Sequence, residues 1–245
     1  MEQSRKKFLK NFFIGAVSVP VLIEACKKDV ESNSGSTGSG NTGSGGSGSG
    51  SCAVAPTETE GPYPTHSPSS YVRSDIRDDR TGIAMTMNIT VKNTNNNCSA
   101  LAGAIVDVWH CDKDGNYSEY GTGYTNLHFL RGRQTTDANG LVNFTTIFPG
   151  WYNGRATHIH VHIFNAAGNS LRITQISFPE GSGSAVVAVN STAGQAYGYT
   201  KGMSGYTYAT SDNIFSDDTA LVEQASVVGS LSGGYVLTHT INVAA

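Results

Sequence analysis

Alternating hydrophobic and polar positions mark much of the chain after residue 80. In IAMTMNITVK, residues 83–92, apolar side chains occupy every second position, with polar or small side chains between them. Because successive side chains of a strand point to opposite faces, this pattern predicts a half-buried strand. Apolar-rich runs predict further strands at residues 104–111, 141–148, 158–164, 171–178 and 234–243. No long stretch repeats with a helical period, and SAVVAVNSTA (184–193) is the nearest to a short helix.

Turn-forming residues separate the predicted strands. TDANG at 136–140 predicts a turn into the strand that follows, and GNS at 168–170 predicts a hairpin. Many strands at hairpin spacing favour an all-β fold with few short helices, an antiparallel β-sandwich or barrel. Residues 52–245 show no internal repeat and no second boundary, so we expect them to form one domain.

The N-terminus carries a different pattern. The basic stretch SRKKFLKNFF leads into an apolar run at residues 12–23, which as a helix would span roughly 18 Å against about 30 Å for a bilayer core. This predicts a signal peptide over residues 1–25 and not a transmembrane anchor. LIEAC resembles the lipobox of bacterial lipoproteins and predicts lipidation of Cys26, the alternative being an ordinary free cysteine near a cleavage site. SRKKFLK leaves the export route open between the Sec and twin-arginine pathways.

A low-complexity segment joins this N-terminus to the predicted domain. Residues 32–51 contain only Ser, Gly, Asn and Thr, so they can bury no apolar surface. We expect residues 26–51 to act as a flexible tether, whose 20 low-complexity residues have an end-to-end distance of roughly 25 Å. A signal peptide, a lipidated cysteine, a tether and a domain, in this order, predict an exported bacterial lipoprotein of the cell envelope, facing the periplasm or the cell surface. It would touch the membrane only through its lipid anchor.

Charge narrows the class of partner. Residues 29–245 contain ten Lys and Arg against seventeen Asp and Glu, a formal net charge of −7. No basic run follows Lys28, so the sequence argues against a nucleic-acid partner.

Three cysteines remain after Cys26. Cys98 and Cys111 flank a predicted strand, which would hold them too far apart for a disulfide. Cys52 can pair with either of them in an exported protein, and Cys52–Cys98 is the preferred alternative.

The candidate chemistry lies in PGWYNGRATHIHVHI, residues 149–163. His158, His160 and His162 alternate along one predicted strand and therefore share a face. Such a row is unfavourable against the core without partners and harmless in solvent, while two of the imidazoles can also bind one Zn, Cu or Fe ion. Tyr117 and Tyr152 lie in nearby turns. As phenolates they would favour Fe(III), and as packed rings they would carry no chemistry.

Five ordered blocks resemble the intradiol ring-cleavage dioxygenases, especially the exported single-chain members of the protocatechuate 3,4-dioxygenase branch. The blocks are TEGPYP (59–64), VDVWHCDKDGNYSEY (106–120), FLRGRQTTDANG (129–140), FPGWYNGRATHIHV (148–161) and TQISFP (174–179). The resemblance implies a β-sandwich with a metal site at its edge. It also implies a non-haem Fe(III) bound by Tyr117, Tyr152, His158 and His160.

The same resemblance assigns further roles. Tyr152 would leave the iron and accept a proton when substrate arrives, Arg155 would stabilise the electron-rich ring, and Gln175 would help to orient it. The pocket-lining segment would comprise Gly61, Pro62 and Tyr63.

The resemblance predicts an enzyme, an oxidoreductase that cleaves a catechol-type diol and incorporates both atoms of O2. The product would be a cis,cis-muconate-type dicarboxylate. The alternative is a non-catalytic surface-binding β-sandwich with a relic metal site. A hydrolase or oxidase that binds Zn or Cu through the histidines is a further alternative, but it has no use for Tyr117 and Tyr152. The sequence leaves open which catechol is cleaved and whether the domain is monomeric.

Overall fold

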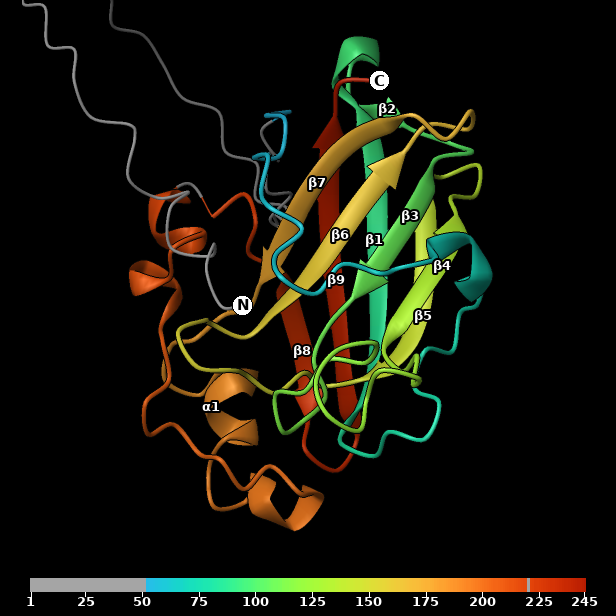
Figure 1. The fold of residues 1–245 in the computed structure, drawn as a ribbon. Coiled ribbons are helices and arrows are strands. Elements are labelled where there is room, and N and C mark those ends of the chain that lie inside the picture. Colours follow the sequence, from blue (N-terminus) through green and yellow to red (C-terminus); the bar gives the residue numbers. More distant parts are fainter. Residues whose placement is uncertain (1–51, 220) are drawn as a thin grey trace, which may run out of the picture. The chain divides into compact units, whose positions relative to one another are not determined.

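The strands of the domain form two stacked sheets (Figure 1). The computed structural model describes residues 52–219 and 221–245, which fall within the second of two units of the chain, residues 49–245. One sheet has the order β2-β1-β9-β8, with β5 also paired to β1, and the other has the order β4-β3-β6-β7. The strands are β1 (Ala84–Asn93), β2 (Ser99–Ala100), β3 (Ile105–Trp109), β4 (Arg131–Thr135), β5 (Leu141–Ile147), β6 (His158–Phe164), β7 (Ser170–Ser177), β8 (Ser226–Ser230) and β9 (Gly234–Val243).

Helical structure is sparse in the described part of the chain. The α-helix α1 (Ala185–Val189) begins after Ser184, whose Oγ accepts a hydrogen bond from the Val187 backbone N–H. The 3-10 turns are Pro68–Tyr71, Thr94–Asn96, Gly194–Tyr197, Ala209–Ser211 and Phe215–Asp217. Within the described ranges, no helix has the length and apolar character needed to cross a membrane.

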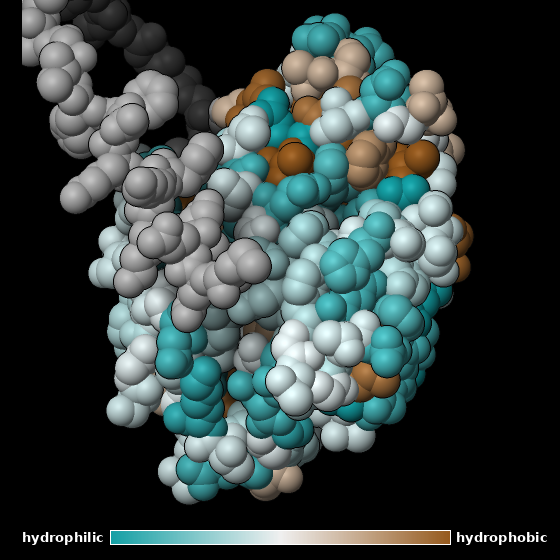
Figure 2. Space-filling view, viewed as in Figure 1, coloured by the Kyte–Doolittle hydropathy of each residue, from teal (hydrophilic) through white to brown (hydrophobic). Residues whose placement is uncertain are grey.

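The hydrophobic core lies between the two sheets. The alternating positions Met85, Met87 and Ile89 of β1 are buried, as are Ile159 and Val161 of β6. Figure 2 shows mainly hydrophilic and neutral residues on the face in view, with hydrophobic residues in small separate spots. The period-two pattern of the sequence therefore separates a core face from an outer face on each sheet.

The structure confirms the predicted β-sandwich and differs from it in detail. Every strand pair is antiparallel except β1 and β9, which run parallel in the larger sheet. This arises because the β8–β9 hairpin adds the last strand to the free side of β1. Strands β2, β4 and β8 were not predicted from the sequence. β4, with the sequence RGRQT, has no apolar alternation because Arg131 and Gly132 are its buried residues.

The three cysteines in the described part of the chain form one disulfide and leave one free thiol. Cys52 and Cys98 form a disulfide with their Cα atoms 6.0 Å apart, which confirms the preferred pairing. Cys111 is buried and unbonded. The predicted signal peptide, Cys26 and the tether lie outside the described residues.

Candidate active site

The histidines of β6 lie on the outer face of the four-stranded sheet, away from the core. Ile159 and Val161 point into the core, so His158 and His160 point to the other side. They are nonetheless buried, 2% and 1% exposed, because loops and the segment around Gly61 cover them. The sequence left two simple environments open for these imidazoles, the core and solvent. The structure shows neither, because both rings lie on the outer face of the sheet and are covered there.

Hydrogen bonds orient the two imidazoles toward one another. The His158 Nδ1 atom donates to the Ala156 carbonyl oxygen at 2.6 Å, which leaves a lone pair on Nε2. The Nε2 atoms of His158 and His160 are 3.1 Å apart. Burial lowers the pKa of His158 to about 3 and that of His160 well below its ordinary value, so both rings are neutral near pH 7.

Two tyrosines complete the cluster. The Tyr117 hydroxyl lies 3.2 Å from His158 Nε2, and the Tyr117 ring packs edge-on against the Tyr152 ring with centroids 5.8 Å apart. The Tyr152 and His158 ring centroids are 5.6 Å apart. Tyr117 is 4% exposed, and burial raises its pKa well above the usual range. Tyr152 is half-buried, and burial raises its pKa while the Arg155 guanidinium opposes the rise.

These four side chains fit a bound Fe(III) ion. A metal-binding imidazole ordinarily donates its other N–H to a carbonyl, as His158 does to Ala156. Two neutral imidazoles and two phenol oxygens offer four donors, and a hard trivalent cation favours the phenolate form that burial disfavours. The described ranges contain no metal-binding group of three or more His, Cys, Asp or Glu side chains, and the two phenols are the further oxygen donors that lie beside the imidazole pair.

The TEGPYP segment covers the histidine pair. Gly61 has a φ of +67°, and a Cβ there would lie 3.0 Å from His160 Cε1, so the close approach requires glycine. Tyr63 stacks on Tyr117 with ring centroids 4.6 Å apart and meets the Tyr152 ring edge-on. A cavity of about 250 Å³ adjoins these rings and is lined by Tyr63, Gly115, Asn116, Tyr117, Tyr120, Gly121, Thr122 and Tyr124. Pro62, between Gly61 and Tyr63, is exposed.

Arg155 and Gln175 lie beside the histidines as a bonded pair. The Arg155 Nη2 atom donates to Gln175 Oε1 at 2.7 Å, and its Nη1 atom lies 3.5 Å from the Tyr152 hydroxyl. Gln175 pairs directly with His160 across the β6–β7 register, which places both side chains on one face. Gln175 also donates to the Thr59 carbonyl oxygen, so it links the covering segment to the sheet.

Arg155 has an acidic partner that was not predicted from the sequence. Asp212 is fully buried, and its Oδ2 atom accepts from Arg155 Nε at 2.8 Å. It lies 57 residues from Arg155, in a stretch with no strand or helix pattern, so the sequence offered no signal for it. Phe215 follows it, with its ring 5.7 Å from the Arg155 guanidinium carbon.

Trp109 is a second missed neighbour. It pairs with His160 across the β3–β6 register, and the two rings stack at 4.9 Å with an interplanar angle of 3°. Both strands were predicted from the sequence. Pairing them in this register would have placed Trp109 beside His160.

The other histidines have separate partners. His162 lies half-buried further along β6, and its ring nitrogens face Glu60 and Ser170. The buried His110 contacts the Cys111 carbonyl and the Thr146 hydroxyl.

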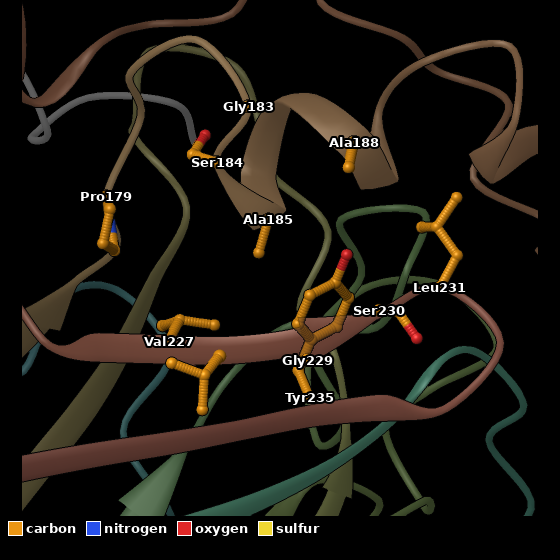
Figure 3. Close-up of a pocket in the computed structure, with 11 residues that line it drawn as sticks. Pro179, Gly183, Ser184, Ala185, Ala188, Val227, Gly229, Ser230, Leu231 and Tyr235 are labelled. Atoms are coloured by element: carbon orange, nitrogen blue, oxygen red, sulfur yellow. The ribbon is translucent and has the colours of Figure 1, made fainter.

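A larger cavity of about 500 Å³ lies apart from this cluster, between α1 and the β8–β9 hairpin (Figure 3). Its lining includes Ala185 and Ala188 of α1 and Tyr235 of β9. It is lined by none of the side chains predicted for the site, so the cluster around His158 remains the candidate active site.

Comparison with known proteins agrees with the geometry. The family described as Dioxygenase matches residues 59–196. A chlorocatechol 1,2-dioxygenase from Rhodococcus opacus is 30% identical over 122 residues, 42% of this chain and 46% of that protein. The chain thus spans about half the length of this curated relative.

Solved structures give the same result. An intradiol ring-cleavage dioxygenase from Tetranychus urticae is 30% identical with a TM-score of 0.67, covering 78% of this chain and 95% of that one. The dioxygenase domain of a dioxygenase and carbohydrate-binding fusion from Streptomyces sp. SirexAA-E is 27% identical with a TM-score of 0.55, covering 78% and 97%. With the clustered tyrosines and histidines, these matches show that the chain belongs to the intradiol ring-cleavage dioxygenase family.

Proposed function

We propose that this protein cleaves a catechol-type diol with O2 between its two hydroxyl-bearing carbons, using a non-haem Fe(III) ion, to give a cis,cis-muconate-type dicarboxylate. The observation that carries the proposal is the convergence of Tyr117, Tyr152, His158 and His160 beside the Arg155–Gln175 pair. These four side chains would hold the ion. When bound, Fe(III) supplies Lewis acidity that favours the deprotonated diol.

The two tyrosines are not equivalent, and their difference supports distinct roles. Tyr117 is 4% exposed, enclosed by Tyr63 and hydrogen-bonded to His158, so it is held in place. Tyr152 is half-buried and has the Arg155 guanidinium 3.5 Å from its hydroxyl. Tyr152 is therefore the residue that can turn outward and, as a phenolate, accept a diol proton at its oxygen, while the nearby Arg155 guanidinium favours the phenolate form.

Arg155 and Gln175 act on the substrate ring. The Arg155 charge stabilises electron density that develops on a deprotonated diol, because a fixed cation in a buried site needs little reorganisation. Gln175 holds the guanidinium from one side through Nη2 and is itself held by the Thr59 carbonyl. Two ring stacks limit the access of water to the donor atoms. Trp109 covers His160 on the sheet, and Tyr63 of the covering segment lies over Tyr117.

The first experiment is a visible absorption spectrum of the purified, iron-loaded full-length chain, before and after catechol is added without oxygen. We expect a broad phenolate-to-Fe(III) band that shifts when catechol binds. Oxygen uptake and product identification then follow with catechol, protocatechuate, hydroxyquinol and a chlorinated catechol. A colourless protein after iron loading, or a coloured one that consumes no oxygen with any of these diols, would contradict the proposal.

We also propose that the chain is exported and anchored through a lipid on Cys26, in the cell envelope of a bacterium. The support is the apolar run, LIEAC and the Ser/Gly tether of the sequence. Labelled palmitate should enter the full-length chain expressed in a bacterial host and should not enter a Cys26→Ser variant. Equal labelling of both chains, or of neither, would contradict the anchor.

A further inference from the structure

The side chain of Asp212 accepts three hydrogen bonds at the rim of the candidate site. Its Oδ2 atom accepts from Arg155 Nε at 2.8 Å and from the Ala156 backbone N–H at 2.7 Å. Its Oδ1 atom accepts from the Ile214 backbone N–H at 2.8 Å. Because the side chain is fully buried, each of these donors would lose its partner if the carboxylate were removed.

These contacts fix the direction of the Arg155 guanidinium. The group is planar, so its orientation is set once Asp212 holds Nε and Gln175 holds Nη2. The remaining nitrogen, Nη1, then lies on the side of the Tyr152 hydroxyl. Phe215 packs near the guanidinium and restricts its movement further.

The same carboxylate also orders the backbone that leads into the histidines. Asp212 binds the N–H of Ala156, whose carbonyl oxygen accepts from His158 Nδ1. One side chain thus contacts both the arginine and the residue that orients a predicted iron ligand. Asp212 lies beyond residues 59–196, the part of the chain matched by the family.

We propose that Asp212 is a positioning residue for the ring-cleavage reaction, which it serves by aiming Arg155 at the substrate position beside Tyr152. The proposal rests on the function proposed above. Asp212 does not contact the iron donors directly and would not transfer a proton. His158 keeps its own hydrogen bond to the Ala156 carbonyl without Asp212, so the loss of Asp212 should act through the direction of Arg155 and lower turnover more than iron or substrate binding.

The test compares Asp212→Asn, Arg155→Gln and the double variant in the iron-loaded full-length chain, with catechol as substrate. Asparagine keeps the shape but removes the charge, and its single oxygen cannot accept from all three donors. We expect kcat to fall about tenfold or more in Asp212→Asn, with KM within about threefold, since a buried charged hydrogen bond is disturbed. The phenolate-to-Fe(III) band should keep its intensity.

The double variant separates positioning from general support. If Asp212 acts through Arg155, the double variant should have the kcat of Arg155→Gln alone, because it has no guanidinium for residue 212 to orient. Tyr206→Phe is the matched control. Its hydroxyl accepts from the Thr157 N–H and anchors the same segment, yet it does not touch Arg155. This control should lower the unfolding midpoint while kcat stays near that of the parent chain.

Three results would overturn the proposal: losses of kcat that multiply in the double variant, an equal loss in Tyr206→Phe, or loss of the iron band in Asp212→Asn. Should Asp212→Asn not fold, Arg155→Lys decides, because lysine keeps the charge but lacks the planar fork through which Asp212 and Gln175 set the direction of the guanidinium. A kcat as low as that of Arg155→Gln supports the proposal, and a parental kcat overturns it.

Failure of the proposed function gives a different result. A parent chain that cleaves none of the diols would remove the reaction itself. The contact between Asp212 and Arg155 is then tested in the metal-free chain by the same cycle in urea. Additive losses of unfolding free energy would show that Asp212 does not hold Arg155, and coupled losses would show that it does.

Discussion

Replacing Gly61 with alanine tests the close approach between the covering segment and the histidine pair. The new methyl group would lie 3.0 Å from His160 Cε1. His160 cannot retreat easily, because it is 1% exposed and Trp109 stacks against it with nearly parallel rings. We expect the imidazole to move by a few tenths of an ångström and to bind iron less well.

Two effects contribute to the expected magnitude. Gly61 has a φ of +67°, and a left-handed conformation costs an L-residue about 1–2 kcal/mol. Displacing His160 comes in addition, and disturbing the residues around a metal ligand typically costs 10–100-fold in metal affinity. Both effects lower the stability of the folded chain, whereas only the second lowers its iron affinity.

Gly168 provides a matched control for the backbone effect. It has a φ of +83° in the turn between β6 and β7, and a Cβ there would meet no atom within 4 Å. Gly168→Ala should therefore lose unfolding free energy in urea through the backbone effect alone and should keep its iron. Iron affinity is measured by competition with a chelator, followed at the phenolate-to-Fe(III) band.

An iron affinity for Gly61→Ala within about twofold of that for Gly168→Ala would refute this reasoning. It would mean either that the covering segment moves aside at no cost or that His160 does not bind the ion. His160→Ala, described next, separates those two explanations.

Four further predictions concern single side chains. Tyr152→Phe should weaken the iron-phenolate colour and slow turnover, and full activity with unchanged colour would remove Tyr152 from the donor set. His160→Ala should lose the iron, measured as metal content after purification; an iron-replete, active variant would count against the whole site. Cys52→Ser should lose about 4 kcal/mol of unfolding free energy in urea from the chain entropy of a disulfide that joins residues 46 apart; an unchanged midpoint would contradict this. Burial lowers the pKa of His110 to about 4, so the unfolded chain binds a proton that the native chain does not between about pH 4 and 6.5. Stability of the metal-free chain should therefore fall as pH drops through this window, by about 3 kcal/mol from this group, and His110→Gln should flatten that slope in urea unfolding.

The predicted ligands were accessible to sequence analysis because short-range patterns carry them. His158 and His160 share a strand face through period-two alternation, and that strand and its hairpin partner were both predicted. Gly61 was assigned to the pocket by resemblance, and its contact with His160 gives a physical reason for the glycine. β4 was missed for the opposite reason, since its buried Arg131 is satisfied by Ser118 and Tyr63, distant residues that no local pattern reveals.

Asp212 could not be predicted from local sequence patterns. The stretch from Tyr199 to Asp217 has only two short 3-10 turns, so neither alternation nor helical period predicts where it lies. Its order comes from contacts with the site rim: Asp212 with Arg155, and the Tyr206 hydroxyl with the Thr157 N–H. Because those partners are set by β6 and the turn before it, the stretch can take this path only once the sheet has formed. The proposed iron donors, which the resemblance assigned, lie on one strand and two turns, whereas the contact of Asp212 with Arg155 depends on the completed fold.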